Sequence, residues 1–106
     1  MSIIGIDLGT TNSLVAVWRN GKSELIPNAF GEYLTPSVVS VDEKGTVYVG
    51  KTAKERLISH PEETASVFKR FMGTEKVYVL SGKMYTPQEL SKLLKKSLIL
   101  QLAIKR

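Results

Sequence analysis

Residues 3–18 of the chain read IIGIDLGTTNSLVAVW, and this stretch decides the fold. Its two apolar, β-branched runs predict strands at residues 3–7 and 13–18. Between these runs the chain places a glycine and three small polar residues: Gly9, Thr10, Thr11 and Asn12. A tight turn with a glycine gathers backbone N–H groups into a concavity that attracts phosphate oxygens, and hydroxyl and amide side chains add donors. The stretch therefore predicts a phosphate-binding turn on a β-hairpin.

Asp7 ends the first of these predicted strands. Its carboxylate would repel a bare phosphate, so a phosphate site makes sense here only with a cation present, such as a hydrated Mg²⁺ that bridges the phosphates. The alternative is an ordinary turn in which Asp7 caps its own backbone. The residues alone leave both interpretations open.

The composition excludes several classes of function. With 106 residues the chain can hold one domain at most. It contains no cysteine, which excludes disulfides and thiolate metal sites and suits a reducing compartment. The first residues lack the pattern of a signal peptide, and no apolar run is long enough to cross a bilayer, so we expect no membrane partner.

The net charge of +5 comes from one segment of the chain. Residues 1–91 carry ten basic and ten acidic side chains, and the whole excess lies in Lys92, Lys95, Lys96, Lys105 and Arg106. No basic stripe interleaved with aromatic residues is present, so the charge does not indicate a nucleic-acid partner.

The first 36 residues predict a three-stranded antiparallel meander. Asn20-Gly21 is a strong hairpin signal, because both central residues of such a turn need positive φ, and residues 23–26 continue as the third strand. Residues 30–36 are expected to form a loop. Residues 37–86 then predict a small hairpin-and-helix subdomain, with hairpins at 37–41/46–49 and 77–80/83–85 and helices at 51–58 and 62–72.

Two helix ends carry clear signals. Gly73 is expected to stop the helix predicted at residues 62–72, with Lys69 and Arg70 near the negative end of its dipole. Thr86-Pro87-Gln88-Glu89 forms a capping box with proline at the first helical position, and it predicts a basic amphipathic helix over residues 87–106.

Residues 45–52 also satisfy the P-loop pattern G-x-x-x-x-G-K-[ST]. The middle of this match, Thr46 to Val49, is bulky and β-branched, as in a strand, whereas a P-loop wraps its amides around a phosphate. We interpret it as a chance match, and replacing Lys51 with alanine should matter little.

The last predicted helix suggests a competing class of function. Its leucines fall at helical spacing, with lysines beside them. If that apolar face is exposed, the chain would self-associate, by exchange of strands or helices, or bind a membrane surface.

Five stretches together resemble the DnaK-type heat-shock chaperones, which are members of the actin-like ATPase superfamily. Residues 5–13 match the first phosphate loop of that family, 34–37 its Thr-Pro-Ser loop, and 49–53 its Gly-x-x-Ala segment. Residues 68–73 match its Lys-Arg-x-x-Gly motif, and 86–90 match the start of the next helix. The matches occur in family order over nearly the whole chain. Details around residues 59–61 and 67–68 are most similar to the HscC-like branch.

The resemblance implies a role for each matching residue. Asp7 would act in catalysis by holding Mg²⁺ through water, and Gly9, Thr10, Thr11 and Asn12 would bind the β- and γ-phosphates of ATP or ADP. Lys69 would be the catalytic lysine at the γ-phosphate, and Arg70 would lie near the adenine. Phosphoryl transfer depends mainly on positioning and charge neutralisation, which agrees with these roles. Without the resemblance, Lys69-Arg70 would be interpreted as a solvated helix end.

The fold that the resemblance implies is α/β, ribonuclease-H-like, and partial: the start of lobe I of an actin-like ATPase. After Ser97 the sequence departs from the acidic, more polar helix of the family, which suggests a truncated or frame-shifted product, or a deliberate fragment. The second phosphate loop and the peptide-binding domain of the family find no match here, so we expect weak or undetectable ATP binding and no hydrolysis. The parent would be a cytoplasmic protein of protein folding and the stress response. It would couple ATP hydrolysis to binding of unfolded polypeptides, with J-domain and nucleotide-exchange partners.

Overall fold

The computed structural model describes residues 3–104, so Lys105 and Arg106 of the basic segment lie outside the described residues. The first sheet contains β1 (Ile3–Leu8), β2 (Asn12–Arg19), β3 (Lys22–Ile26) and the short β4 (Thr35–Pro36). Its order is β1-β2-β3, all antiparallel, with β4 paired to the start of β2. The predicted meander is confirmed, and the predicted loop at 30–36 is wrong only at its end, where β4 forms.

The turn between β2 and β3 has the predicted backbone. Asn20 has φ 52° and Gly21 has φ 75°, so both central residues are left-handed. The same device closes the last hairpin, where Ser81 and Gly82 have φ 52° and 79° between β8 (Tyr78–Leu80) and β9 (Lys83–Tyr85). Both hairpins were therefore predictable from their turn residues.

The second sheet has the order β6-β5-β7. It consists of β5 (Val38–Val41), β6 (Val47–Val49) and β7 (Thr64–Ser66), and α1 (Lys51–Ser59) follows β6 directly. Val47 to Val49 pair with β5, so the stretch that matches the P-loop pattern is a strand and a helix start, as interpreted above.

The helix predicted at residues 62–72 is wrong. The chain instead forms a single 3₁₀ turn, η1 (Pro61–Glu63), then β7, then a second 3₁₀ turn, η2 (Phe68–Phe71). Thr64 and Ala65 pair with Ser40 and Val39 of β5, and Val67 adopts a left-handed φ of 48°, which breaks the helix. Pairing with a strand more than twenty residues away outweighs the local helical signal here.

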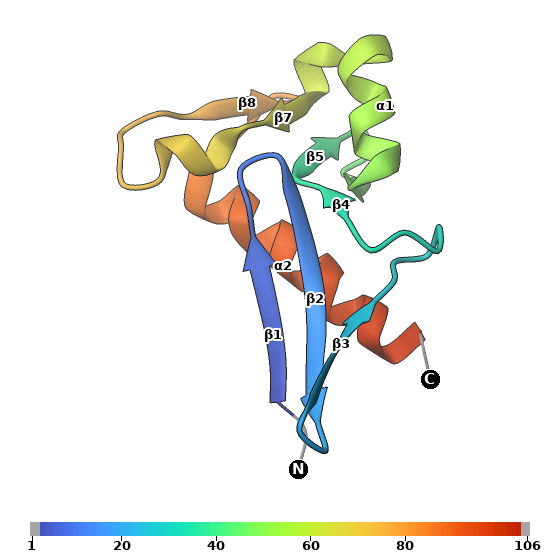
Figure 1. Ribbon diagram of the computed structural model, residues 1–106. Coiled ribbons are helices and arrows are strands. Elements are labelled where there is room, and N and C mark those ends of the chain that lie inside the picture. Colours follow the sequence, from blue (N-terminus) through green and yellow to red (C-terminus); the bar gives the residue numbers. More distant parts are fainter. Residues whose placement is uncertain (1–2, 105–106) are drawn as a thin grey trace.

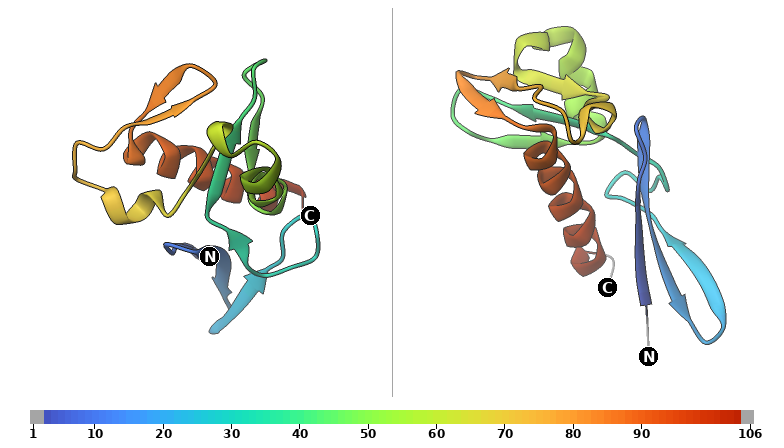
Figure 2. Two further views of the ribbon diagram at one scale, coloured as in Figure 1. Left: turned by 90° about the horizontal axis from the view of Figure 1, so that it is seen from above. Right: turned by 90° about the vertical axis from the view of Figure 1, so that its left-hand side faces the viewer.

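The long helix α2 (Pro87–Ile104) covers one face of the first sheet and runs beneath the second sheet and the β8–β9 hairpin (Figure 1). Seen from the side, α2 lies on one side of β1–β3 and the described chain leaves the other side open (Figure 2, right). The apolar face of α2, Leu90, Leu94 and Leu98, is buried in a core shared with both sheets. Gln101 donates a hydrogen bond of 3.2 Å to the Ile26 carbonyl, which ties the helix to β3.

The capping box at the start of α2 is present as predicted. The Glu89 amide donates to Thr86 Oγ1 at 3.1 Å, and the Thr86 amide donates to Glu89 Oε1 at 2.8 Å. These two bonds satisfy backbone donors that the first turn of a helix leaves unpaired.

Replacing Thr86 with alanine should lower the free energy of unfolding by about 1 kcal/mol, because it removes the cap. Gln88→Ala, at an exposed position of the same turn, is the control and should change it by less than about 0.5 kcal/mol. Urea denaturation followed by circular dichroism measures both. Equal effects of the two substitutions would contradict the role of the cap.

Candidate functional site

The β1–β2 turn requires glycine at position 9 for steric reasons. A Cβ atom built on Gly9 would lie 2.3 Å from the carbonyl oxygen of Asn12, far inside van der Waals contact. Glycine is not needed here for a left-handed backbone, because Gly9 does not have the positive φ of the other turn glycines. The backbone of Gly9 therefore lies too close to the Asn12 carbonyl to leave room for a side chain, and the absence of a Cβ would also let a phosphate approach closely.

Ser37, between β4 and β5, holds this turn in place through hydrogen bonds. Its hydroxyl donates to the Gly9 carbonyl at 2.7 Å and lies 2.8 Å from Ser13 Oγ, and its amide donates to the Thr11 carbonyl at 2.9 Å. Both Ser13 and Ser37 are buried. The turn is thus joined through one residue, Ser37, to the segment that leads into the second sheet.

These bonds set the direction of the turn's amides. In a trans peptide the C=O and the following N–H point in opposite directions, and the described backbone contains no cis peptide. Because the Gly9 and Thr11 carbonyls point at Ser37, the N–H groups of Thr10 and Asn12 point away from it. Two backbone donors of the turn are therefore directed to the side away from Ser37, where an external acceptor could reach them.

Asp7 lies on one particular face of the first sheet. It pairs with Leu14, while the adjacent pair, Ile6 and Val15, faces the core. Since neighbouring residues of a strand alternate between faces, Asp7 is on the face opposite α2, where its side chain is exposed. Among the described residues no three acidic or histidine side chains gather into a metal site, so Asp7 could hold a cation only together with water or ligand oxygens.

Lys69 and Arg70 lie on η2 and are exposed, instead of near the end of the predicted long helix. Phe68, 1% exposed, anchors this turn in the core, and Val67 before it is left-handed. A β-branched residue in this conformation is strained. In Figure 1 and in the right-hand view of Figure 2, the tip of the β1–β2 turn lies beside η2.

Two hollows border the turn. One of about 190 Å³ includes Thr10, Thr11, Ser37, Ser66 and Val67 in its lining, so the turn is a close neighbour of the segment that leads into η2. A larger, mainly apolar groove of about 720 Å³ begins at Asn12 and extends past Tyr33 to α1. Lys54 of α1 lines both hollows. Asp7, Lys69 and Arg70 line neither of the two.

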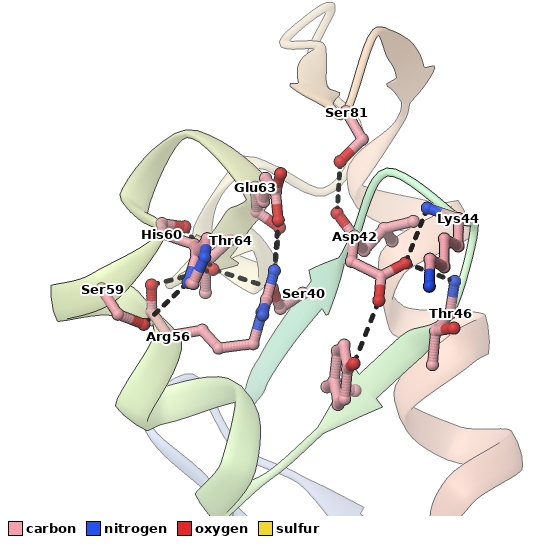
Figure 3. A network of polar contacts seen from close by, with 12 residues as sticks. Ser40, Asp42, Lys44, Thr46, Arg56, Ser59, His60, Glu63, Thr64 and Ser81 are labelled. Atoms are coloured by element: carbon pink, nitrogen blue, oxygen red, sulfur yellow. Dashed lines mark hydrogen bonds and ion pairs between the residues drawn. The ribbon is translucent and has the colours of Figure 1, made fainter.

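A buried polar network holds β7 in place (Figure 3). Because β7 leads into η2, the network also positions the segment before η2. Arg56 of α1 forms an ion pair with Glu63 and donates from Nε to Ser40 Oγ at 2.7 Å. The Thr64 hydroxyl lies within hydrogen-bond distance of Ser40 Oγ and of the His60 carbonyl, at 2.9 and 2.8 Å. The network therefore links α1, β5 and β7 through polar side chains.

The network continues into the β5–β6 turn. The Arg56 guanidinium lies 4.7 Å from the centre of the Tyr48 ring, and the Tyr48 hydroxyl donates to Asp42 Oδ2 at 3.0 Å. A hydrogen bond from the Thr46 amide is the main cause that lowers the pKa of Asp42. The bond to Asp42 raises the pKa of Tyr48. Asp42 thus stays ionised as the acceptor that closes this hairpin.

The structure brings together some of the residues that the sequence singled out. Gly9, Thr10, Thr11 and Asn12 form one turn, and this turn is close to the segment that carries Lys69 and Arg70. Sequence reasoning missed the roles of Ser37 and Lys54. Ser37 follows a proline in a matched family loop, which was the available signal, whereas nothing in the pattern of α1 distinguishes Lys54 from its other exposed cations.

Mixed α and β elements with antiparallel sheets are consistent with a partial actin-like ATPase fold. The family model of the Hsp70 protein matches residues 3–105. The chaperone protein DnaK of Thermotoga neapolitana (strain ATCC 49049 / DSM 4359 / NBRC 107923 / NS-E) is 46% identical over 97 residues, which is 91% of this chain and 16% of that relative. The chain belongs to the Hsp70 family, and the resemblance to DnaK-type chaperones is confirmed.

Gly9→Ala should lower the free energy of unfolding by about 2 kcal/mol, because the new Cβ would meet the Asn12 carbonyl. Gly5→Ala on β1 is the matched control: a Cβ there has no atom within 4 Å, so the change should stay within about 0.5 kcal/mol. Urea denaturation measures both. A Gly9 variant as stable as the Gly5 variant would mean that the turn is not sterically restricted.

Val67→Asn should raise the free energy of unfolding by about 1 kcal/mol, because asparagine tolerates the left-handed conformation that strains valine. Val79→Asn, in the extended and exposed part of β8, is the control and should lower stability by a few tenths of a kcal/mol. Thermal unfolding followed by circular dichroism compares them. A loss of stability at both positions would contradict the assigned strain.

Proposed function

We propose that this chain supplies the first phosphate-binding turn of a chaperone ATPase. The observation that carries the proposal is the set of bonds from Ser37, which turn the Thr10 and Asn12 amides to one side. Such amides, with the hydroxyls of Thr10 and Thr11, suit the β- and γ-phosphates of ATP or ADP. Membership of the Hsp70 family supports a nucleotide as the ligand.

The charged residues have distinct parts in this proposal. Asp7 would hold the Mg²⁺ of the nucleotide through water, which suits a lone exposed carboxylate better than direct coordination by a protein cage. Lys69 would neutralise charge at the γ-phosphate, and Arg70 would lie near the adenine. The closeness of η2 to the turn supports the part given to Lys69.

The chain spans about one sixth of the length of the DnaK relative that it matches. We therefore infer only for a longer protein that ATP hydrolysis is coupled to binding and release of unfolded polypeptides, with a J-domain protein and a nucleotide-exchange factor as partners. For the 106-residue chain we expect weak nucleotide binding and no hydrolysis. A reducing compartment such as the cytoplasm suits a chain without cysteine.

The competing function, a membrane-surface or self-associating module driven by α2, is not favoured. It required the leucine face of α2 to be exposed, and Leu90, Leu94 and Leu98 are buried instead. None of the described helices is long and apolar enough to span a bilayer.

Titration of the ¹⁵N-labelled chain with Mg-ATP tests the proposal. Amide shifts should concentrate at Gly9–Asn12 and at η2, with an affinity weaker than micromolar and no release of phosphate. Lys69→Ala should weaken binding several-fold, because it removes a cation from the phosphates. Lys22→Ala, at an exposed position of the β2–β3 turn, is the matched control and should leave binding unchanged.

Three results would contradict the proposal: shifts centred on Lys51 and Thr52, no shifts at millimolar Mg-ATP, or equal effects of the two lysine substitutions. Micromolar binding with turnover would contradict the expectation for the isolated chain.

A further inference from the structure

Arg56 of α1 contacts three other elements of the chain. It forms an ion pair with Glu63 of η1 and donates from Nε to Ser40 Oγ of β5 (Figure 3), and its guanidinium lies 4.7 Å from the centre of the Tyr48 ring of β6. The side chains of Arg56 and Glu63 are 15% and 9% exposed. Ser40 is fully buried and donates its own proton to the Glu63 carbonyl at 3.0 Å. The pair is therefore an internal feature of the chain, with its partners on described elements.

A buried ion pair contributes little net stability, because both charges lose their hydration. Replacing such a pair with apolar side chains of similar volume is often neutral, whereas removing one partner is strongly destabilising. A fully bonded polar network can instead specify one arrangement of the segments that carry it. The segment that the Arg56–Glu63 pair can specify is β7, because Thr64, its first residue, follows Glu63 directly.

The strand β7 has little in its own sequence to fix its pairing with β5. It consists of Thr64, Ala65 and Ser66, and only Ala65 belongs to the apolar core. A strand with few apolar side chains specifies its register weakly, and a slip by one residue moves the chain by about 3.3 Å and turns each side chain to the other face. The polar network fixes the first residue of the strand, where the Thr64 hydroxyl lies 2.9 Å from Ser40 Oγ.

The chain is fixed again just after β7 by Phe68, which is 1% exposed. Only Val67 separates Phe68 from the strand, and Val67 has the left-handed φ of 48° that strains a β-branched residue. Such a residue relaxes unless the structure around it determines its conformation. The register of β7 on one side and the burial of Phe68 on the other are these restraints, and Lys69 is the next residue of the chain.

We propose that Arg56, through its pair with Glu63, is a positioning residue for Lys69. The pair holds β7 in one register against β5, which keeps Val67 left-handed and sets the place of η2 beside the β1–β2 turn. The part that concerns the nucleotide rests on the proposed function, in which Lys69 acts at the γ-phosphate. The register of β7 and the conformation of Val67 do not depend on a ligand.

The test replaces both members of the pair at once, because Arg56→Met alone would leave the Glu63 carboxylate buried without its partner. Arg56→Met/Glu63→Leu should stay folded, since its apolar side chains are similar in volume to those they replace. Glu55→Met/Glu62→Leu, which changes the neighbouring exposed position on each element, is the matched control. Glu63→Gln, which keeps the shape and removes the charge, is a second variant and should have a smaller effect in the same direction. Circular dichroism shows whether each chain is folded.

The first measurement is a double-mutant cycle on stability, with Val67→Asn made in each background. In the unaltered chain and in the control, this substitution should raise the folding equilibrium constant about fivefold. In the Arg56→Met/Glu63→Leu chain the increase should fall below about twofold, because Val67 is no longer held in the strained conformation. The three-bond coupling between the amide and Hα protons of Val67, which reports φ, should change in that chain and not in the control.

The second measurement is titration of the same chains with Mg-ATP. Lys69→Ala should weaken binding several-fold in the unaltered chain and in the control, and by less than about twofold when the pair is absent. A pair with a merely structural role would lower stability and leave the effects of Val67→Asn and Lys69→Ala unchanged.

Two results would overturn the proposal: an increase from Val67→Asn that is equal in all backgrounds, or an effect of Lys69→Ala that persists after loss of the pair. Absence of Mg-ATP shifts in the unaltered chain would contradict the proposed function itself. The Val67 cycle then decides alone whether the pair fixes the register of β7.

Discussion

The hydroxyl of Ser37 links the β1–β2 turn of the first sheet to the segment that leads into the second sheet. It bonds to the Gly9 carbonyl and to Ser13, while its backbone amide bonds to the Thr11 carbonyl. One buried residue therefore satisfies polar groups from β1–β2 and from the segment between β4 and β5. A buried polar group left unpaired costs more than its bond contributes, so this arrangement specifies one position of the turn.

The chemistry of the turn follows from this constraint. Carbonyls held toward Ser37 leave the intervening amides on the other side, and Gly9 lets the backbone close without a clash. On the neighbouring segment the buried Arg56–Glu63 network and the anchor at Phe68 hold Val67 in a strained conformation. Strain of this kind persists where the surrounding structure determines the conformation, and it is common near functional sites.

The features that were predictable from the sequence are those with local causes. The Asn20-Gly21 turn and the Thr86–Glu89 cap each depend on a few neighbouring residues, and both are present. The segment 62–72 was predicted incorrectly because its outcome depends on β5, to which Thr64 and Ala65 pair across a long sequence separation. The sequence could also match Ser37 to a family loop, but its bonds to the turn exist only once both sheets are formed.

The same distinction applies to the site. Residues 9–12 are contiguous, so their gathering into one turn was predictable, whereas the closeness of η2 to that turn depends on the path of β7. The Hsp70 match shows the family, and the roles proposed for the site residues depend on it. The helix α2 then closes the core beneath the two sheets.

The most direct test of the joint at Ser37 is the free energy of unfolding of a Ser37→Ala variant, measured by native-state hydrogen exchange. Loss of the hydroxyl leaves the Gly9 carbonyl and Ser13 without their partner, so stability should fall by about 2 kcal/mol, with protection lost in both β2 and β5. A fall of less than about 0.5 kcal/mol, or lost protection confined to residues 36–38, would contradict the account.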